Sequence, residues 1–339
     1  MKVCVYLEFK NFLGGLLFKK IGSGMISSYN NQMAMLNKMG VEVVEKWDGS
    51  CDILMTNSPW PRAYFLAWRA RKKGKKVVVW AHNTAEDIMS VFWFNKYFFP
   101  LAKRYLARFY NLGDVIFAPS AYTKSLLVNY GLNPDKIVVQ SNGVNLKDFY
   151  PDEAKRQAMR QKFGLHGMAV GMVGLAIPRK GIDTFLYLAK KFPAIDFIWY
   201  GKIYNSLMVR PEYKNKLPNV QFTGFVEDIN AAFNSLDIFI FPSYEENQGM
   251  VIMEAAAVGL PVLVRNIPVY ESWLTNRECC LKAKNNEEFV ESLKKLTDSE
   301  KLRKKLSQDI KKIAQENSLE IVEDQFKKIL LELAGNIQK

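Results

Sequence analysis

The sequence predicts an α/β protein built from two doubly wound domains. Short apolar runs rich in β-forming residues alternate with helical stretches, and this alternation restarts after a charged, proline-containing segment at residues 151–166. At 339 residues the chain is also long for a single hydrophobic core. Strands that alternate with helices form parallel sheets whose crossover helices cover both faces. We therefore expect a first domain over 1–150, a linker over 151–166 and a second domain over 167–315.

The predicted strands are apolar runs, and the helices between them show longer polar-apolar periods. The first domain has predicted strands at 3–7, 53–55, 77–80, 115–118 and 137–139, and helices at 30–39, 61–73 and 124–130. The second domain has predicted strands at 169–174, 197–201, 220–222, 238–241 and 262–264. From residue 286 the pattern is helical, and we expect residues 316–339 to form a helix that packs back on the first domain.

The composition is that of an ordinary globular protein, with 49% apolar and 24% charged residues. The four cysteines follow no metal-ligand spacing, which favours reduced thiols in the cytosol. No segment approaches the roughly 18 uninterrupted apolar residues that a membrane span requires, and the N-terminus is typical of a first strand instead of a signal peptide. We expect a cytoplasmic protein that is soluble or peripheral to a membrane.

The net charge of +13 is concentrated in the first domain. Residues 1–150 contain 20 Lys and Arg against 10 Asp and Glu, whereas the remainder contains 27 against 24. The excess lies in 62–76 and 91–110, where cations alternate with large aromatic residues. This combination suits the anionic inner face of the cell membrane, where each cation contributes about 1 kcal/mol. A solvated helix face is the alternative, and we expect no nucleic-acid partner because no nucleic-acid-binding motif is present.

Two glutamates, Glu246 and Glu254, are the most informative feature of the sequence. Residues 236–241 read as a strand that Pro242 and Ser243 end, so Glu246 should lie on a loop at the carboxyl end of that strand. Residues 250–258 contain no Gly or Pro and favour a helix, which places Glu254 about one turn inside. The open N–H groups of that helix could bind an anion, with a carboxylate on either side to accept hydrogen bonds from hydroxyls. Acidic residues near a helix start can also serve only the helix dipole.

Three further candidates follow predicted strands, where ligands bind in open α/β sheets. Arg179 and Lys180 follow the strand at 169–174 and precede a glycine, an arrangement suited to clamping a diphosphate. Fixed cations would stabilise the charge that develops on a leaving phosphate. His82 follows the strand at 77–80. The alternatives are a basic pair that caps a loop and a histidine with a structural role.

The first β–α loop is rich in glycine, and Gly22 and Gly24 would let the backbone approach a ligand closely. The pattern is only weak evidence for a dinucleotide site, because the third glycine of that fingerprint is missing.

The string P-S-x-x-E-x-x-G-x-x-x-x-E-A-x-A-x-G-x-P-V resembles the E-x7-E signature of the retaining GT-B glycosyltransferases that use nucleotide-sugar donors, of the family 4 type. The resemblance covers most of the chain, including I-G-S-G-M, W-A-H-N-T-A-E-D, P-S-A-Y-T-K, S-N-G-V and R-K-G-I-D. The chain departs from the family pattern at Leu175, where many members have an arginine. In this chain Arg179 could supply that charge from a different position. These motifs, as they stand in this sequence, look most like those of bacterial enzymes that glycosylate diacylglycerol or glucosyl-diacylglycerol. Of the two, we favour the enzymes that add the second sugar to a monoglycosyl lipid.

The resemblance implies a GT-B fold, two Rossmann-like domains facing a cleft, and α-retaining transfer from a UDP-hexose. Glu246 would hold hydroxyls of the donor sugar, Glu254 would accept from the ribose, and Arg179 and Lys180 would neutralise the leaving UDP, while His82 positions the sugar. The implied catalytic residues are His82, Arg179, Lys180 and Glu246. The implied donor-binding residues are Gly22, Gly24, Asn247, Gln248, Gly249, Met250, Val251 and Glu254.

No D-x-D triplet is present, so we expect protein cations, and no metal or other cofactor, to neutralise the leaving group. The sequence leaves glucose and galactose open as the donor sugar. Two rival functions are a sugar-nucleotide epimerase of the same fold and a membrane-associated binding protein that has lost catalysis.

Overall fold

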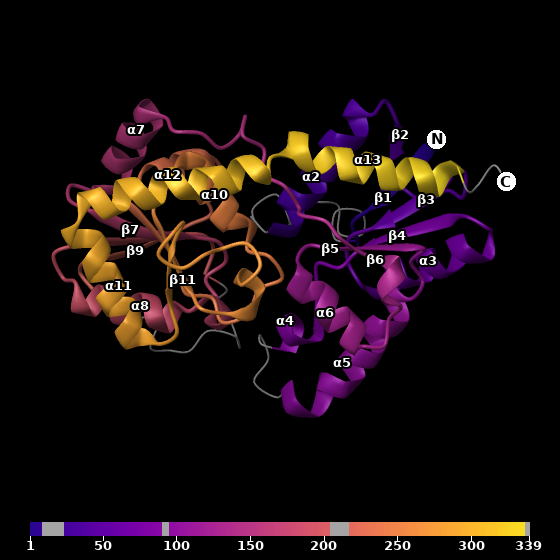
Figure 1. Ribbon diagram of the computed structural model, residues 1–339, viewed down its shortest axis with the longest axis horizontal. Helices are drawn as coiled ribbons and strands as arrows, with labels where there is room; N and C mark the ends of the chain where they lie inside the picture. Colours follow the sequence, from indigo (N-terminus) through magenta and orange to yellow (C-terminus); the bar gives the residue numbers. More distant parts are fainter. Residues whose placement is uncertain (9–23, 90–94, 204–216, 336–339) are drawn as a thin grey trace. The chain divides into compact units, whose positions relative to one another are not determined.

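The computed structural model describes residues 1–8, 24–89, 95–203 and 217–335, and the chain divides into two compact units (Figure 1). Unit 1 holds the N-terminal strand, residues 24–143 and the C-terminal segment from Leu319, whereas unit 2 runs from Val144 to Ser318. Each unit is built on a six-stranded sheet. The predicted α/β fold class is therefore confirmed.

The sheet of unit 1 has the order β2-β1-β3-β4-β5-β6, and every neighbouring pair is parallel. Its strands are β1 (Lys2–Tyr6), β2 (Glu42–Val44), β3 (Ile53–Thr56), β4 (Lys76–Trp80), β5 (Val115–Ala118) and β6 (Ile137–Val139). The sequence reading missed β2, a three-residue edge strand with a charged first residue and no fully buried position. The carboxyl ends of β1, β3 and β4 lie at one edge of this sheet.

Helices cover both faces of this sheet, as parallel crossovers require. Ala67 of α3, Phe109 of α5 and Leu127 of α6 belong to the core on one face. Leu36 of α2 and Phe326 of α13 belong to the core on the other, where Figure 1 shows α13 beside α2. The helices of unit 1 are α2 (Gly24–Lys38), α3 (Pro61–Lys72), α4 (Ala85–Met89), α5 (Asn95–Tyr110), α6 (Ala121–Asn129) and α13 (Leu319–Gly335).

The last helix, α13, is thus part of the N-terminal unit although it ends the chain. The ring of Phe326 lies 6.1 Å from that of Trp80 and 5.6 Å from that of Phe117. Lys38 Nζ of α2 lies 2.6 Å from Glu323 Oε2. Burial of one apolar face and this ion pair hold the C-terminal helix on the first sheet.

The sheet of unit 2 has the order β12-β11-β10-β7-β8-β9, again with parallel neighbours throughout. Its strands are β7 (Ala169–Val173), β8 (Asp196–Tyr200), β9 (Val220–Gly224), β10 (Ile238–Phe241), β11 (Val262–Arg265) and β12 (Leu281–Ala283). Its helices are α7 (Glu153–Phe163), α8 (Ile182–Lys191), α9 (Ile229–Asn234), α10 (Met250–Val258), α11 (Asn286–Asp298) and α12 (Glu300–Glu316). The loops that follow β7, β10 and β11 lie at one edge of this sheet.

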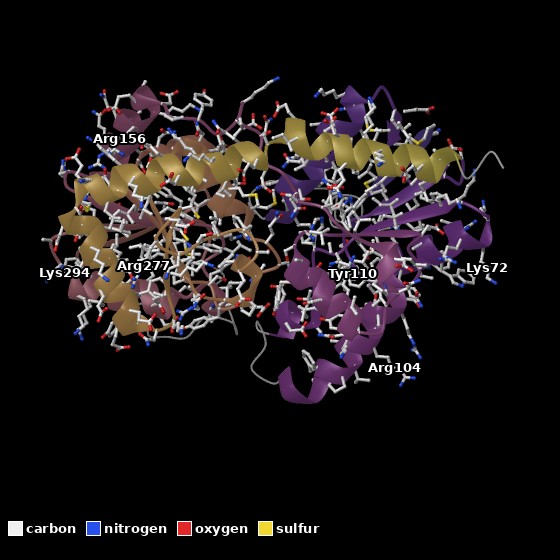
Figure 2. The ribbon with its side chains drawn as sticks, viewed as in Figure 1. Lys72, Arg104, Tyr110, Arg156, Arg277 and Lys294 are labelled. Carbon is white, nitrogen blue, oxygen red and sulfur yellow. The ribbon has the colours of Figure 1, made fainter. Side chains whose placement is uncertain are left out.

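The structure differs from the predicted linker at 151–166, because helix α7 occupies most of this segment. Asp152 caps the helix by accepting a 2.9 Å hydrogen bond from Lys155 N. Arg156, labelled in Figure 2, pairs with Asp237 at 2.6 Å and so ties α7 to unit 2. The charges that suggested a linker lie on this helix, where Arg156 and Arg160 both pair with Asp237, and Pro151 is the residue before its cap. The chain passes between units at Gly143 and Val144 instead.

Candidate active site

The predicted glutamate motif forms a loop and helix at the carboxyl end of β10. Helix α10 spans Met250–Val258, as the sequence predicted. Its N-cap is Gly249, whose φ of 83° lies in the left-handed region that favours glycine, and no side chain caps the first turn. Both Glu246 and Glu254 are buried, at 7% and 5% exposed. Two carboxylates and a helix N-terminus are therefore held in one enclosed region of unit 2.

Glu246 is the centre of a buried cluster of ionic and hydrogen-bonded groups. Its Oε1 lies 2.5 Å from Lys180 Nζ and 3.3 Å from Arg179 Nη1, and Ser243 Oγ donates a 2.6 Å hydrogen bond to the same atom. Burial raises the pKa of this carboxyl, but the two cations and the hydrogen bonds outweigh burial and hold the pKa below its usual value. Glu246 is therefore ionised at neutral pH.

A second glycine explains how the basic pair reaches this carboxylate. Gly181 has a φ of 78°, and a Cβ at this position would lie only 2.4 Å from Pro242 O. Tyr244 N donates a 2.9 Å hydrogen bond to Arg179 O. The turn after β7 and the loop after β10 thus contact each other through backbone, which places both cations against Glu246.

Sequence reasoning missed Arg265, the last residue of β11, which hydrogen-bonds to the start of the loop after β10. Its buried guanidinium donates to Pro242 O at 2.9 Å and to Thr184 Oγ1 at 2.7 Å. It also lies 3.9 Å from the centre of the Tyr244 ring. A cation at the carboxyl end of a predicted strand was the signal that could have found it. Ser243, whose hydroxyl bonds to Glu246, was noted in the sequence only as a strand breaker.

Glu254 has an environment opposite to that of Glu246. Burial alone raises the pKa of this carboxyl to about 7. Near neutral pH it therefore exists in both charge states, and it can accept hydrogen bonds from hydroxyls when it is ionised.

The remaining predicted donor-binding residues of unit 2 surround the start of α10. Gln248 and Gly249 are buried just before the helix, and Asn247 is half-buried. Met250 and Val251 are its first two residues, where backbone N–H groups lack intrahelical acceptors. The N-terminus of α10 therefore offers donors suited to an anion.

His82 and Gly24 belong to unit 1. His82 follows β4 and stacks on Trp80, with ring centres 5.6 Å apart. Its Nε2 lies 3.1 Å from Asn57 Oδ1 and 3.3 Å from Ser28 Oγ. Burial lowers the pKa of His82 to about 4, so the imidazole is neutral at pH 7. It can position a ligand through hydrogen bonds but supplies no charge.

Gly24 is the exposed first residue of α2, and Gly22 lies outside the described residues. Within the described ranges, no group of three or more His, Cys, Asp or Glu side chains is arranged to hold a metal ion.

Comparisons with known proteins identify the class of enzyme. The pattern described as "Glycosyl transferases group 1" matches residues 156–313, and that described as "Glycosyltransferase Family 4" matches residues 34–148. The chain is 30% identical over 341 residues to the processive diacylglycerol alpha-glucosyltransferase of Acholeplasma laidlawii, covering 98% of each chain. It is 26% identical to the alpha-galactosylglucosyldiacylglycerol synthase of Streptococcus pneumoniae, covering 89% of this chain and 84% of that one.

The chain belongs to the glycosyltransferase family that these two patterns, group 1 and family 4, describe.

Solved structures agree on the fold of this glycosyltransferase. HepE of Anabaena, solved with UDP and glucose, superposes with a TM-score of 0.78 at 16% identity, covering 98% of this chain and 100% of that one. WaaG, a glycosyltransferase of lipopolysaccharide biosynthesis, gives a TM-score of 0.70 at 18% identity, covering 96% and 99%. The predicted GT-B fold and glycosyltransferase class are therefore confirmed.

We expect Glu246→Gln and Lys180→Ala each to lower the turnover of this glycosyltransferase by about 100-fold or more, because each removes a charge held in a buried, enclosed site. Steady-state rates of the purified variants test this, with Lys190→Ala as a control because Lys190 is an exposed cation on α8. A near-normal rate for folded Lys180→Ala would show that the cation beside Glu246 is not needed for turnover.

Glu254 should make the stability of the enzyme depend on pH. Its pKa in the folded state, about 7, lies above the ordinary value of 4.5. Between these values the folded state holds a proton that the unfolded state releases, so stability falls as pH rises from about 4.5 to 7, by roughly 3 kcal/mol at most. Urea denaturation at pH 5, 6, 7 and 8 should show this loss in the wild type and a smaller slope in Glu254→Gln. Equal slopes in both proteins would contradict the assignment.

Proposed function

We propose that this enzyme is a hexosyltransferase that moves a hexose from a UDP-sugar to a diacylglycerol-based glycolipid, with retention at the anomeric carbon and an α-linkage. The observation that carries the proposal is the Glu246 cluster at the start of α10, in a chain that is 30% identical over nearly its whole length to a processive diacylglycerol glucosyltransferase. The second relative is named as a synthase of a two-sugar diacylglycerol lipid. Glucosyl-diacylglycerol is therefore our preferred acceptor, with diacylglycerol as the alternative.

In the proposed complex, the donor diphosphate binds at the N-terminus of α10, near Gln248 and Gly249. Glu246 accepts hydrogen bonds from hydroxyls of the donor sugar, and Glu254 accepts from the ribose. For the sugar to reach Glu246, the ionic contacts of Arg179 and Lys180 with that carboxylate must rearrange, and this turns both cations toward the phosphates.

The reaction breaks the bond between the anomeric carbon and the phosphate oxygen, and UDP leaves with the electron pair. The acceptor hydroxyl forms the new bond on the same face and gives its proton to the leaving phosphate. Arg179, Lys180 and the N–H groups of α10 stabilise the charge on UDP, so no metal is needed in this scheme. His82, being neutral, contributes by orienting the sugar.

The acceptor lipid lies in a membrane, and unit 1 has a surface suited to an anionic one. The rings of Tyr64 on α3 and Tyr105 on α5 stack 5.8 Å apart, so the two helices share one surface. Its exposed aromatic and apolar side chains include Phe65 at 51%, Phe98 at 52% and Leu101 at 63%. We define the basic-aromatic surface as these side chains together with the exposed Trp60, Arg62, Trp68, Arg69, Lys72, Arg104, Tyr105 and Arg108.

Cations and rings alternate on this surface. Lys72 Nζ lies 6.0 Å from the centre of the Trp68 ring, one turn away on α3. Figure 2 shows Lys72 and Arg104 extending away from the ribbon of unit 1. Rings that lodge among headgroups and cations that attract anionic lipid are the two components of peripheral binding. Residues 91–94, which belong to the basic-aromatic segment predicted at 91–110, lie outside the residues that the structure describes. Among the described helices, none has both the length and the hydrophobicity needed to cross a bilayer.

The donor and acceptor can be identified in one assay. We expect labelled hexose from UDP-glucose or UDP-galactose, but not from GDP-glucose, to appear in lipid product when glucosyl-diacylglycerol is supplied, with less product from diacylglycerol. The reaction should proceed in EDTA because protein cations replace the metal. Consumption of UDP-sugar without lipid acceptor would favour the epimerase, no turnover with any pair would favour the silent binding protein, and strict dependence on Mn²⁺ would contradict the metal-free scheme.

We expect the enzyme to sediment with vesicles that contain anionic lipid and much less with neutral vesicles. Arg69→Glu combined with Lys72→Glu should weaken this binding by about 10-fold or more, because each cation near the headgroups contributes about 1 kcal/mol. Lys294→Glu combined with Lys301→Glu is the matched control, since both lysines are exposed in unit 2 and lie outside the basic-aromatic surface. Equal sedimentation with both vesicle types would contradict the proposal.

A further inference from the structure

Tyr270 carries a buried hydroxyl that takes no part in the contacts of the Glu246 cluster. It ends the short 3-10 helix Pro268–Tyr270 after β11, and its side chain is 0% exposed. Its hydroxyl has no hydrogen-bond partner among the described residues. By contrast, the hydroxyl of buried Tyr200, in the same unit, lies 2.7 Å from Ser235 Oγ. A buried hydroxyl without a partner is costly, typically by about 1–3 kcal/mol, and therefore requires a reason.

The Tyr270 hydroxyl lies beside the start of α10. A Cβ built on Gly249, the N-cap of that helix, would lie 3.2 Å from the Tyr270 oxygen. The ring packs edge-on against Trp273, with centres 5.8 Å apart, which fixes its direction. A side chain at position 249 would crowd this hydroxyl, so the glycine permits both the left-handed turn and the close approach of the helix start to Tyr270.

The hydroxyl keeps its proton and is a hydrogen-bond donor. Burial raises the pKa of Tyr270 well above its usual value, and the negative charge of Glu246 raises it further. Glu246 does not take this hydrogen bond, since the Tyr270 hydroxyl has no partner among the described residues. A protonated donor, without an acceptor in the described ranges, thus lies next to a helix N-terminus that has no side-chain cap.

We propose that the Tyr270 hydroxyl donates a hydrogen bond to a diphosphate oxygen of the nucleotide-sugar donor at the N-terminus of α10. This assignment rests on the proposed function, which puts the diphosphate at that helix. The ligand would then supply the acceptor that the described residues do not provide, and the hydroxyl would add a directed donor to the helix N–H groups and the two cations. A hydrogen bond to a charged acceptor in an enclosed site is among the strong ones.

Tyr270→Phe tests the proposal because it removes one oxygen and keeps the packed ring. We expect the affinity for UDP, measured by titration calorimetry, to fall by about 10–100-fold, with a comparable loss in kcat/KM. The affinity for uridine, which has no phosphate, should be unchanged. The melting temperature should be unchanged or higher, since an unsatisfied buried group has been removed.

Tyr200→Phe is the matched control. It removes a buried hydroxyl that has a partner in Ser235, so it should lower the melting temperature and leave the affinity for UDP unchanged. The two variants therefore separate a ligand-binding hydroxyl from a structural one by opposite changes in stability and binding.

Three results would overturn the assignment. These are normal UDP affinity in Tyr270→Phe, equal loss of UDP and uridine affinity, and a loss seen only with the intact UDP-sugar, which would place the contact on the sugar. Lys180→Ala in the same titrations shows whether the Tyr270 contact alone or the whole proposed diphosphate site is wrong. If Lys180→Ala weakens UDP binding and Tyr270→Phe does not, the role of Tyr270 alone is wrong; if neither does, the proposed diphosphate site is wrong.

Discussion

The structure of the site depends on one buried carboxylate held by two cations. Glu246 is 7% exposed and would be costly to bury as an anion, but Lys180, Arg179 and Ser243 all bond to the same oxygen. This requirement explains why the turn after β7 must touch the loop after β10, and why a glycine stands at 181, where a Cβ would lie 2.4 Å from Pro242 O. The pairing makes the two loops one unit.

The same pairing gives the two glutamates different properties. Glu246 has cations within contact and is ionised at neutral pH, whereas burial alone raises the pKa of Glu254 to about 7. The E-x7-E spacing therefore does not produce two equivalent acids. One carboxylate lies in the loop beside the cations and is ionised at neutral pH, and the other changes charge near neutral pH inside the first turns of the helix. Such a difference suits separate contacts on one ligand.

The sequence predicted the site helix and ten of the twelve described strands, because these are set by local patterns, and it missed the three-residue edge strands β2 and β12. Helix α10 begins after Gly249 and ends before Gly259, as the absence of Gly and Pro between them indicated. What it missed depended on long-range contacts. Helix α7 was taken for a linker because its charges pair only in the fold, as Arg156 does with Asp237, 81 residues away. The bracing contact of Arg265 with Pro242 joins neighbouring strands whose order no local pattern reveals.

The glutamate motif could be read as a site because its residues are polar in a region that otherwise reads as core. Tyr270 could not, since a tyrosine after a strand is an ordinary core residue in sequence. It is distinguished by a buried hydroxyl that has no partner among the described residues and lies beside the N-cap of α10. Phenylalanine would keep the packed ring and remove the unsatisfied hydroxyl, so the oxygen has no stabilising contact in the described fold. A ligand oxygen at the start of α10 would give this donor the partner that the described residues do not supply. The N-cap glycine beside it fits that role, because a Cβ at position 249 would crowd the hydroxyl at 3.2 Å.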